Sequence, residues 1–494
     1  MRILRPIVLA AAIPASASAQ ASPPPPGPSF AVESAVRARR VVADGIAAIG
    51  GLDSLRRVTT LRRELSGTRS DWGQGLEPGR HSDRPVSTVN VVDLAGRRVY
   101  QSTRSQILGG QPFDFRNAAT PSTAFSANGS VRTVSPSPPA AVPQTLARLA
   151  RRHPEAVLLA ALDRAGTLRY LGSRGGEEVV TFADVDGDQL TLAFDAATHL
   201  LRRVERIYDD TTFGDAVSAI AFEDYRRAGP VLTPYRIVDL AAGRVLQTLD
   251  ASRVAVNEPL PDSLFSPPAG FAPAEQVATA PVEIAPGITV YPGSYTSVVL
   301  EEPDHLVVLE PGGNQFEAER RIAALKQRYP TKPIRYVVAT HFHHDHLGGV
   351  RAYVAEGATI VTTEHARQAV ELAVRSPHRL RPDALERRPA QPRVEVVTGR
   401  RVLGEGAGRV EIIPIGPSPH AEQMLIAWIP AARAVLEADL LDVTAGRATP
   451  AGDDTRAFAA RLRALGLEPE RIIAVHSGLA TPADLAAALA ASAP

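Results

Sequence analysis

Four histidines and one aspartate lie within six residues of this 494-residue chain, in the run His341-Phe342-His343-His344-Asp345-His346. The whole chain has 12 histidines, so a third of them are concentrated here. The preceding residues, 334–339, have the composition of a buried strand. Gly348 and Gly349 follow, and we expect them to let the backbone turn tightly beneath an ion. Because imidazole and carboxylate suit zinc and neighbouring divalent metals, the run predicts a metal site of the kind that hydrolases use.

The spacing within the run predicts two ions. In an extended segment, His341 and His343 project to the same side, so this pair can hold one ion. Asp345 and His346 come one step later, past the bend, and can face a second ion. The alternative is a histidine-rich surface loop that binds metal adventitiously, but such a loop needs neither the strand before it nor the glycines after it.

Three single residues farther along the chain complete the candidate ligand set. His420 follows the apolar residues 412–415, Asp439 ends the apolar stretch 434–438, and His476 ends the stretch 471–475. Each position alone is more typical of a capped or solvated residue at a strand end. Together with the first cluster, however, they repeat one pattern, a potential ligand at the end of a strand.

The order His341-x-His343-x-Asp345-His346, followed by His420, Asp439 and His476, resembles the metallo-β-lactamase superfamily over about residues 281–494. The resemblance implies an αββα sandwich with the metals at one edge. It also implies that His341, His343 and His420 hold the first metal. Asp345, His346 and His476 would hold the second, and Asp439 would bridge both. His344 falls at a variable position of the motif.

Two departures from the family pattern limit what can be transferred. The family usually ends its opening strand with an aspartate that supports the metal loop, whereas this chain has Glu310. After the third-ligand histidine the family often has Thr-x-Gly, but this chain has Ala421-Glu422-Gln423. The resemblance therefore implies the metal chemistry and leaves the substrate open.

We expect two divalent metal ions as cofactors, with zinc favoured and iron or manganese as alternatives. Two ions about 3.5–4 Å apart can share a water and lower its pKa towards neutrality, which gives a hydroxide nucleophile. Asp345 is the expected catalytic residue, because it would orient this hydroxide and carry a proton to the leaving group.

Length and composition predict a two-domain globular protein. A chain of 494 residues exceeds one ordinary core, and its hydrophobic content of 44% and charged content of 22% are typical of folded proteins. The predicted fold is α+β: a mainly antiparallel β domain with a few helices over residues 31–265, a linker over 266–283, and the αββα hydrolase domain over 284–494. The net charge is +1 without a basic stripe, which argues against a nucleic-acid partner.

The first residues have the features of an export signal. A positive start, a short apolar middle and a small-residue pattern at Ala17-Ser18-Ala19 predict a signal peptide over residues 1–19, followed by a proline-rich spacer over 20–30. The apolar middle is too short to span a bilayer, so no transmembrane segment is expected in the mature chain. We therefore expect a periplasmic or secreted protein. Because the chain has no cysteine, it would be stabilised without disulfides.

Short alternating runs from Val58 to about Val256 predict the strands of the N-terminal domain. Helices are expected over residues 31–57, over 145–164 and, at the end of the chain, from Pro482 to about Ala491. The strand pattern weakly resembles the curved half-barrel of lipoprotein-carrier-like periplasmic domains. That resemblance implies a concave apolar face for a hydrophobic ligand. The alternative is a scaffold that covers part of the metal site.

Arginines crowd the stretch from Arg375 to Arg393, between the first cluster and His420. Because guanidinium suits carboxylate and phosphate, the stretch is either an anion-recognising loop at the mouth of the site or a solvated loop.

The predicted function is an exported binuclear hydrolase that cleaves an ester, lactone, thioester or amide-type bond of a small molecule. Within enzymes the alternative is a β-lactamase-like activity, although the absence of cysteine excludes the β-lactamase class with a cysteine ligand. The alternative from another class is a non-catalytic envelope carrier whose metals are structural. Metal content and turnover on a substrate panel would separate the two classes.

Overall fold

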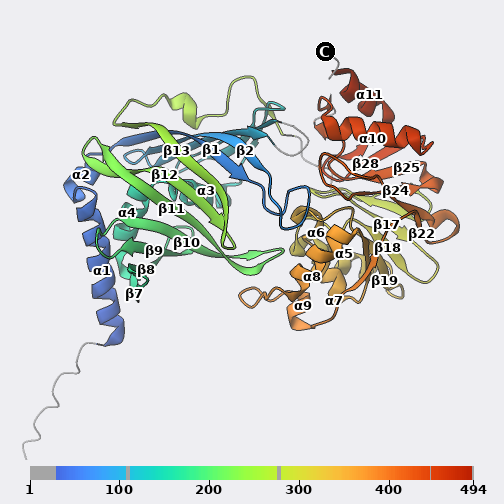
Figure 1. The fold of residues 1–494 in the computed structure, drawn as a ribbon, viewed down its shortest axis with the longest axis horizontal. Helices are drawn as coiled ribbons and strands as arrows, with labels where there is room; N and C mark the ends of the chain where they lie inside the picture. Colours follow the sequence, from blue (N-terminus) through green and yellow to red (C-terminus); the bar gives the residue numbers. More distant parts are fainter. Residues whose placement is uncertain (1–28, 107–111, 275–279, 445–446, 492–494) are drawn as a thin grey trace, which may run out of the picture.

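The computed structural model describes residues 29–106, 112–274, 280–444 and 447–491. Figure 1 shows two bodies side by side, an N-terminal one dominated by a curved sheet and a C-terminal one of sheets and helices. The predicted signal peptide and most of the proline-rich spacer lie outside the described residues. In the described part, no helix is both long and apolar enough to cross a membrane.

Two helices open the described chain, α1 (Phe30–Ala48) and α2 (Leu52–Arg56). The Ser29 side chain accepts a hydrogen bond from the backbone N–H of Val32 and so caps α1. Residues Ala38, Val42 and Ile46 recur every four positions and are buried, so one face of α1 packs into the core. Gly50 separates the two helices with a φ of 120°, a conformation that favours glycine.

The N-terminal sheet has fourteen strands in the order β14-β6-β5-β4-β3-β2-β1-β13-β12-β11-β10-β9-β8-β7. Neighbours are antiparallel except for β14, which runs parallel to β6, and β1 pairs with β13 near the middle of the sheet. The strands are β1 (Thr60–Ser70), β2 (Asp83–Asp93), β3 (Arg98–Gln106), β4 (Pro112–Ala119), β5 (Ala124–Asn128), β6 (Thr133–Pro136), β7 (Arg169–Arg174), β8 (Glu177–Ala183), β9 (Gln189–Asp195), β10 (Leu201–Asp210), β11 (Gly214–Ala228), β12 (Val231–Ala241), β13 (Arg244–Val256) and β14 (Ala272–Pro273). The prediction of a mainly antiparallel domain is therefore confirmed.

Helices cover one face of this curved sheet. Between β6 and β7 the chain forms α3 (Val142–Ala150) and α4 (Pro154–Asp163), close to the predicted helical interruption. Figure 1 shows α1, α3 and α4 on the same side of the strands. The main apolar core joins α1 and α4 to the sheet through residues such as Val42, Leu158, Phe182, Phe194 and Phe222. The helices therefore fill much of the concave face that the weak resemblance left open for a ligand.

Part of the predicted linker, residues 266–283, belongs to the sheets. Ala272–Pro273 forms β14 against β6, and Val282 begins the first strand of the C-terminal domain. Pairing of these short pieces ties the connection to both bodies, because their backbone groups find partners there.

The C-terminal domain contains two main sheets with helices outside them. The first sheet comprises β15 (Val282–Ala285), β16 (Ile288–Tyr291), β17 (Ser297–Glu301), β18 (Leu306–Leu309), β19 (Ile334–Val338), β20 (Thr359–Thr362) and β21 (Arg393–Val396). The second comprises β22 (Arg401–Leu403), β23 (Val410–Pro414), β24 (Leu425–Ile429), β25 (Ala434–Glu437), β28 (Arg471–Ala474) and β29 (Gly478–Ala480). A small separate hairpin consists of β26 (Val443–Thr444) and β27 (Arg447–Ala448).

Alternation along the strands builds the layers of this domain. Val298 and Leu300 of β17 face the core between the two sheets, whereas Val299 faces the core beneath the helices. Helices α5 (Gln315–Arg328), α7 (Val350–Ala355), α8 (Glu364–Arg375) and α9 (Ala384–Arg387) cover the first sheet. Helices α10 (Asp453–Ala464) and α11 (Pro482–Ala491) cover the second. This arrangement is the predicted αββα sandwich.

Hydrogen bonds among the described residues join the two domains at the β1–β2 loop and at the β10–β11 turn. The loop between β1 and β2 reaches the metal-site loop of the C-terminal domain (Figure 1). The turn between β10 and β11 meets residues 377–380, where the Asp215 carboxylate accepts hydrogen bonds from the N–H groups of Arg379 and Leu380. His378 Nδ1 lies 2.6 Å from Asp209 Oδ1 across the same domain boundary. Part of the arginine-rich stretch therefore serves as a docking segment between domains.

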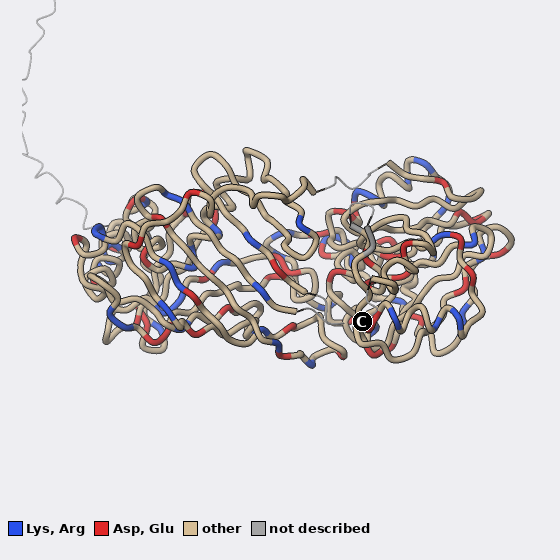
Figure 2. The backbone as a smooth tube through the Cα atoms, turned by 90° about the horizontal axis from the view of Figure 1, so that it is seen from above, with Lys and Arg blue, Asp and Glu red and all other residues tan. Residues whose placement is uncertain are grey.

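Charge is distributed rather than polarised. Figure 2 shows basic and acidic residues interspersed along the backbone of both domains. This distribution accords with the formal net charge of +1. Selectivity for a charged ligand must therefore come from local groups rather than from an overall field.

Candidate metal centre

The histidine-rich loop begins where β19 ends. Residues 339–343 leave the strand, and His344 begins the short helix α6 (His344–Leu347). The two glycines that follow form the turn between α6 and α7, as expected, but both have negative φ, so the turn does not depend on a left-handed conformation. A Cβ on Gly348 would lie 2.0 Å from the Gly313 carbonyl oxygen, and one on Gly349 would lie 2.2 Å from that of Pro311. These glycines instead allow the backbone after β18 to pack directly against the metal-site loop.

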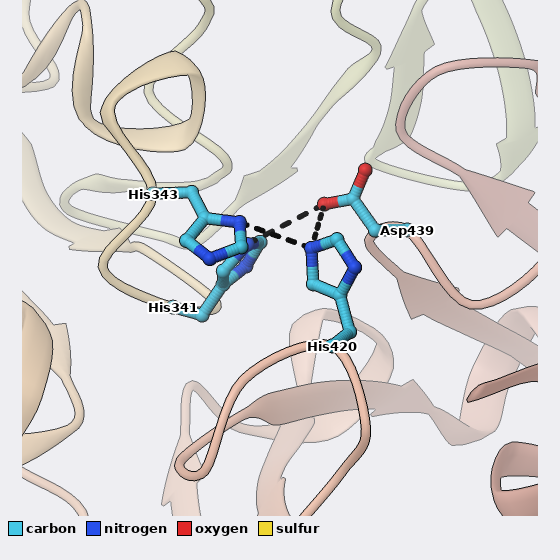
Figure 3. Close-up of side chains that lie close together, drawn as sticks. All are labelled: His341, His343, His420 and Asp439. Atoms are coloured by element: carbon cyan, nitrogen blue, oxygen red, sulfur yellow. Dashed lines mark hydrogen bonds and ion pairs between the residues drawn. The ribbon is translucent and has the colours of Figure 1, made fainter. Parts of the chain in front are cut away.

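The structure brings the first predicted ligand set together. His341, His343, His420 and Asp439 each offer a ligand atom, and these atoms lie within 4.8 Å of one another. Figure 3 shows the three imidazole rings and the carboxylate gathered around one point. His420 Nε2 lies 3.0 Å from His343 Nδ1 and 3.3 Å from Asp439 Oδ2. All three histidines are buried.

The second predicted set also converges. Asp345, His346 and His476 offer ligand atoms within 4.8 Å of one another. His346 Nε2 lies 3.1 Å from His476 Nε2, and His476 Nε2 lies 3.8 Å from Asp345 Oδ2. The residues come from α6 and from the end of β28, so the fold places distant parts of the chain at one edge of the sandwich.

Asp439 lies between the two sets. Its Oδ2 is 3.4 Å from His341 Nε2 and 2.7 Å from His346 Nε2, while its Oδ1 is 2.8 Å from His476 Nε2. The residue follows β25 with a φ of 61°, a left-handed conformation that is uncommon outside glycine. This backbone turn presents the carboxylate to both sets, as a bridging ligand requires.

Glu310 supports the metal-site loop from beneath. Its Oε1 accepts a hydrogen bond from the Thr340 N–H at 2.9 Å, and its Oε2 lies 2.9 Å from His346 Nδ1. The side chain is buried, and its own φ is 66°. Glu310 therefore contacts the loop at the place where the family usually has an aspartate. By engaging Nδ1 it leaves His346 Nε2 to face the centre.

Burial keeps two histidines of the first set uncharged. Burial, reinforced by His346 and His343, holds the pKa of His341 well below its usual range. Burial and the neighbouring His420 lower the pKa of His343 to about 3. Both imidazoles are therefore neutral at physiological pH, which is the form that binds a metal.

Carboxylates have the opposite effect at the second set. Burial alone would lower the pKa of His346, but Asp439 and Asp345 raise it well above its usual range. The His476 pKa is raised in the same way, with Asp439 outweighing burial. The centre therefore attracts positive charge, which a metal cation would supply in place of protons.

Two buried atoms at the centre make no hydrogen bond of good geometry to any residue that the structure describes. They are His341 Nε2 and Asp439 Oδ2, and Asp439 Oδ2 nevertheless lies within ion-pair distance of His341, His346 and His420. An unpaired buried acceptor costs free energy unless a ligand compensates for it. Four nitrogen and oxygen donors around one point suit zinc and similar divalent ions. The residues therefore fit a metal at this position, and their role as ligands stays a prediction.

The sequence did not reveal that the N-terminal domain takes part in this site. Gln74 Nε2, from the β1–β2 loop, donates a hydrogen bond to Asp345 Oδ1 at 2.6 Å. His343 Nε2 donates to the Gly75 carbonyl oxygen at 2.8 Å. This second bond leaves His343 Nδ1 to face the metal position. Because these contacts join residues about 270 positions apart, no local motif signals them.

The same loop contacts the stretch in which this chain departs from the family pattern. In the Ala421-Glu422-Gln423 stretch, the Glu422 N–H donates to the Leu76 carbonyl oxygen at 3.0 Å. The region after the third-ligand histidine therefore borders the N-terminal loop.

A cavity of about 700 Å³ opens beside the candidate ligands and extends between the domains. The C-terminal domain contributes Asp345, His420, Asp439 and His476 to its wall. The N-terminal domain contributes Arg69, Ser70, Asp71, Trp72, Gln74, Arg152, Asp239, Leu246 and Gln247. Its volume lies within the range of about 300–1,000 Å³ that is typical of small-molecule sites.

Comparison with known proteins identifies the family of the C-terminal part. Residues 290–476 match the sequence model of the metallo-beta-lactamase superfamily. This part of the chain is a metallo-beta-lactamase superfamily domain. The predicted family is thereby confirmed for the C-terminal half, and the match supports the predicted hydrolase class.

Individual relatives are more distant. A linear primary-alkylsulfatase from Pseudomonas sp. (strain ATCC 19151) is 36% identical over 58 residues, which are 12% of this chain and 11% of that protein. The chain thus matches about a tenth of the length of this relative. Solved metallo-beta-lactamases from Pontibacter korlensis and Hirschia baltica are 16% and 17% identical, with TM-scores of 0.34 and 0.32. Each match covers 44% of this chain and 99% of the other.

Proposed function

We propose that this protein is an exported metal-dependent hydrolase that uses two divalent ions to cleave an ester, lactone, thioester or amide-type bond of a small molecule. The observation that carries the proposal is the convergence of the two candidate ligand sets, His341/His343/His420/Asp439 and Asp345/His346/His476, beside one cavity. The predicted signal peptide supports export, and zinc is the favoured metal because the ligands are nitrogen and oxygen donors.

The ions, when bound, supply the acidity that activates a water molecule and the positive charge that polarises the bond under attack. The side chains of the protein hold the ions and orient the reacting groups. His341 and His343 are neutral because burial lowers the pKa of each, so their lone pairs are free for ligation. Asp439 Oδ2 lies near His341 and His420 of the first set, and its Oδ1 lies near His476 of the second.

Asp345 is the candidate catalytic residue. Burial raises its pKa, but the neighbouring histidines His346, His344 and His476 together lower it, so the net shift is downward and the carboxylate is ionised at neutral pH. It lines the cavity and can orient a water molecule or accept its proton. The Gln74 amide donates a hydrogen bond to Asp345 Oδ1, and the Tyr295 hydroxyl donates one to Asp345 Oδ2 at 3.3 Å. These two bonds fix the carboxylate relative to a substrate in the cavity.

Tyr295 provides a proton donor at the same place. Burial and the neighbouring Asp345 raise the pKa of its hydroxyl. The hydroxyl therefore stays protonated and can donate a hydrogen bond to the carboxylate or to a leaving group.

The test combines metal analysis with turnover on purified full-length protein. Zinc, iron and manganese would be measured, and chromogenic ester, lactone, β-lactam and phosphodiester substrates would be assayed. The alkylsulfatase relative adds an alkyl sulfate to this panel. We expect two metal equivalents and turnover of at least one substrate. His341→Ala, Asp345→Ala and His476→Ala should each lose metal and activity while the N-terminal domain stays folded. Undiminished turnover by metal-free protein would contradict the proposal.

A carrier is the second candidate, favoured by one observation. A cavity of about 280 Å³ lies between α3, α4 and the sheet, and most of its lining is apolar. Zero turnover by protein with two bound metals, together with a co-purified lipid, would favour the carrier over the hydrolase.

A further inference from the structure

The concave face of the N-terminal sheet contains a second cavity, of about 230 Å³, that adjoins the interdomain cavity. Arg152, Asp239 and Leu246 line both cavities, so the two meet at these residues. The metal centre and the inner face of the N-terminal domain are thus parts of one connected site, and a ligand at the metals can reach the sheet.

Four arginines gather at this second cavity: Arg148, Arg151, Arg152 and Arg206. Three of them have acidic partners. Arg151 binds Asp184, Asp186 and Asp188, Arg152 lies 2.8 Å from Asp239, and Arg206 lies 3.5 Å from Asp188. Glu205 also lines the cavity, and its carboxylate forms an ion pair with Arg203.

Arg148 has no acidic partner among the residues that the structure describes. It lies on α3, its side chain is exposed, and it lines the cavity. Burial, and next the nearby charges of Arg152, Arg151 and Arg206, lower its pKa. The neighbouring Arg152 has a buried nitrogen, Nη1, without a hydrogen-bond partner. An anion could therefore bind the guanidinium of Arg148 and the Nη1 of Arg152, whose Nη2 already pairs with Asp239.

The rest of the cavity wall is largely apolar. Leu149, Leu190, Val204, Ile220, Leu240 and Leu246 line it beside the arginines. Such a wall suits a hydrocarbon segment attached to an anionic group. The segment would bury its apolar surface there without removing polar groups from water.

We propose that Arg148 and Arg152 bind the anionic group of a ligand, a carboxylate, sulfate or phosphate on an apolar stem, that extends from the metal centre onto the N-terminal sheet. As an assignment of substrate class, this inference rests on the proposed hydrolase function. As an anion-binding subsite, it can be tested independently of turnover. It gives the N-terminal domain a role in substrate selection in addition to its contacts with the metal-site loop.

Isothermal titration of the zinc-loaded full chain with a matched pair of probes tests the subsite. Octanoate carries the charge, and octanamide has the same chain length without it. We expect octanoate to bind the wild type about tenfold more tightly, because a charge-assisted hydrogen bond is lost with the neutral probe. Arg148→Gln should remove this preference. Arg174→Gln should keep it, since Arg174 is also an exposed arginine of this domain but lines neither cavity.

Charge reversal provides a gain of binding that misfolding cannot produce. Arg148→Glu should weaken octanoate binding and strengthen octylammonium binding about tenfold relative to wild type. Octanoate affinity that is equal in wild type and Arg148→Gln would overturn the inference.

The metal centre is the competing site for a carboxylate, and His341→Ala separates the two. If octanoate sits on Arg148, its affinity persists in the His341→Ala chain and falls in Arg148→Gln. If its affinity falls in His341→Ala and not in Arg148→Gln, the anion sits on the metals and the subsite is refuted. Turnover of the substrate panel is a separate readout, so failure of the hydrolase proposal is distinguishable from failure of this one.

Discussion

Gln74 and Asp345 are hydrogen-bonded across the domain boundary, with 2.6 Å between Gln74 Nε2 and Asp345 Oδ1. The bond joins the β1–β2 loop of one domain to a candidate metal ligand of the other. Together with the bond between His343 and the Gly75 carbonyl, it makes the N-terminal domain part of the support of the metal centre. Partners of this kind orient the groups that bind a metal directly.

Replacing Gln74 by alanine should weaken metal binding at the second set. The Asp345 carboxylate would lose one of the two hydrogen bonds that fix it, and loss of such a partner typically costs about 10–100-fold in metal affinity or activity. Competition with a chromogenic chelator measures the affinity of each site. Gln144→Ala is the matched control, because Gln144 is exposed on α3 and far from the loop in sequence. Equal zinc affinity in Gln74→Ala and wild type would show that the bond is dispensable.

The two ligand sets predict a pattern of metal loss. His420 belongs to the first set and His476 to the second, so His420→Ala and His476→Ala should each reduce the zinc content from two equivalents to about one. Asp439→Ala should reduce it further, because this carboxylate contacts histidines of both sets. Elemental analysis of the purified chains gives the stoichiometry.

His344→Ala is the matched control for these variants. His344 lies in the same loop and lines the interdomain cavity, but it belongs to neither ligand set. It should retain two equivalents of zinc. A loss of metal in His344→Ala equal to that in His476→Ala would refute the assignment of the sets.

Glu310→Gln should weaken the metal centre although it preserves the shape of the side chain. Glu310 accepts from the Thr340 N–H and lies 2.9 Å from His346 Nδ1. A glutamine can keep the first bond, but it loses the negative charge that favours a donor at Nδ1. We expect about 10–100-fold lower metal affinity, measured by chelator competition. Glu33→Gln, an exposed substitution on α1, controls for the loss of one acidic side chain. Unchanged affinity in Glu310→Gln would mean that the negative charge of Glu310 does not contribute to metal binding.

The sequence predicted the C-terminal domain better than the N-terminal one for a physical reason. The candidate ligands lie far apart in the sequence, but each follows an apolar run and its residue type is restricted by the chemistry, so His341 through His476 could be proposed from these local signals and from the family resemblance. The N-terminal domain was predicted as a mainly antiparallel sheet with a few helices, and its curvature followed only from a weak resemblance, because strand alternation specifies which face is buried but not the order or curvature of the strands.

The contribution of Gln74, Gly75 and Arg152 to the site could not be predicted from the sequence. These residues act through contacts with the other domain or through a cavity shared with it. An amide, a backbone carbonyl and an arginine are common surface groups, and only their position in the folded chain gives them a role. The turn at Gly348 and Gly349 was expected, but the backbone packed against these two residues could not be predicted, because it belongs to a distant part of the chain.

The N-terminal core contains a charge network that predicts the pH dependence of stability. Arg63 Nη2 binds the Glu155 carboxylate at 2.8 Å, and Arg63 Nη1 donates to His153 Nδ1 at 2.8 Å. Arg63, His153 and Glu155 are all buried. Burial, and next the Arg63 cation, hold the pKa of His153 well below its usual range. The folded chain therefore keeps His153 neutral, with Nδ1 as the acceptor.

The sign of the pH effect follows from this shift. Below the ordinary histidine pKa of about 6.5, the unfolded chain binds a proton at His153 that the folded chain does not bind. The free energy of unfolding should therefore fall as the pH drops below about 6.5, by at most about 1.4 kcal/mol per pH unit from this residue. Above that pH the contribution is constant.

His153→Gln isolates this contribution, because glutamine offers Arg63 an acceptor oxygen but does not titrate. We expect the variant to lose less stability than wild type between pH 6.5 and 5.5, in denaturant unfolding followed by circular dichroism at constant zinc. The difference between the two chains removes the effect of the metal-site histidines, which titrate equally in both. If wild type and variant lose the same free energy over this interval, His153 is not held neutral in the fold, and the buried Arg63–Glu155 pair must tolerate a second cation beside it.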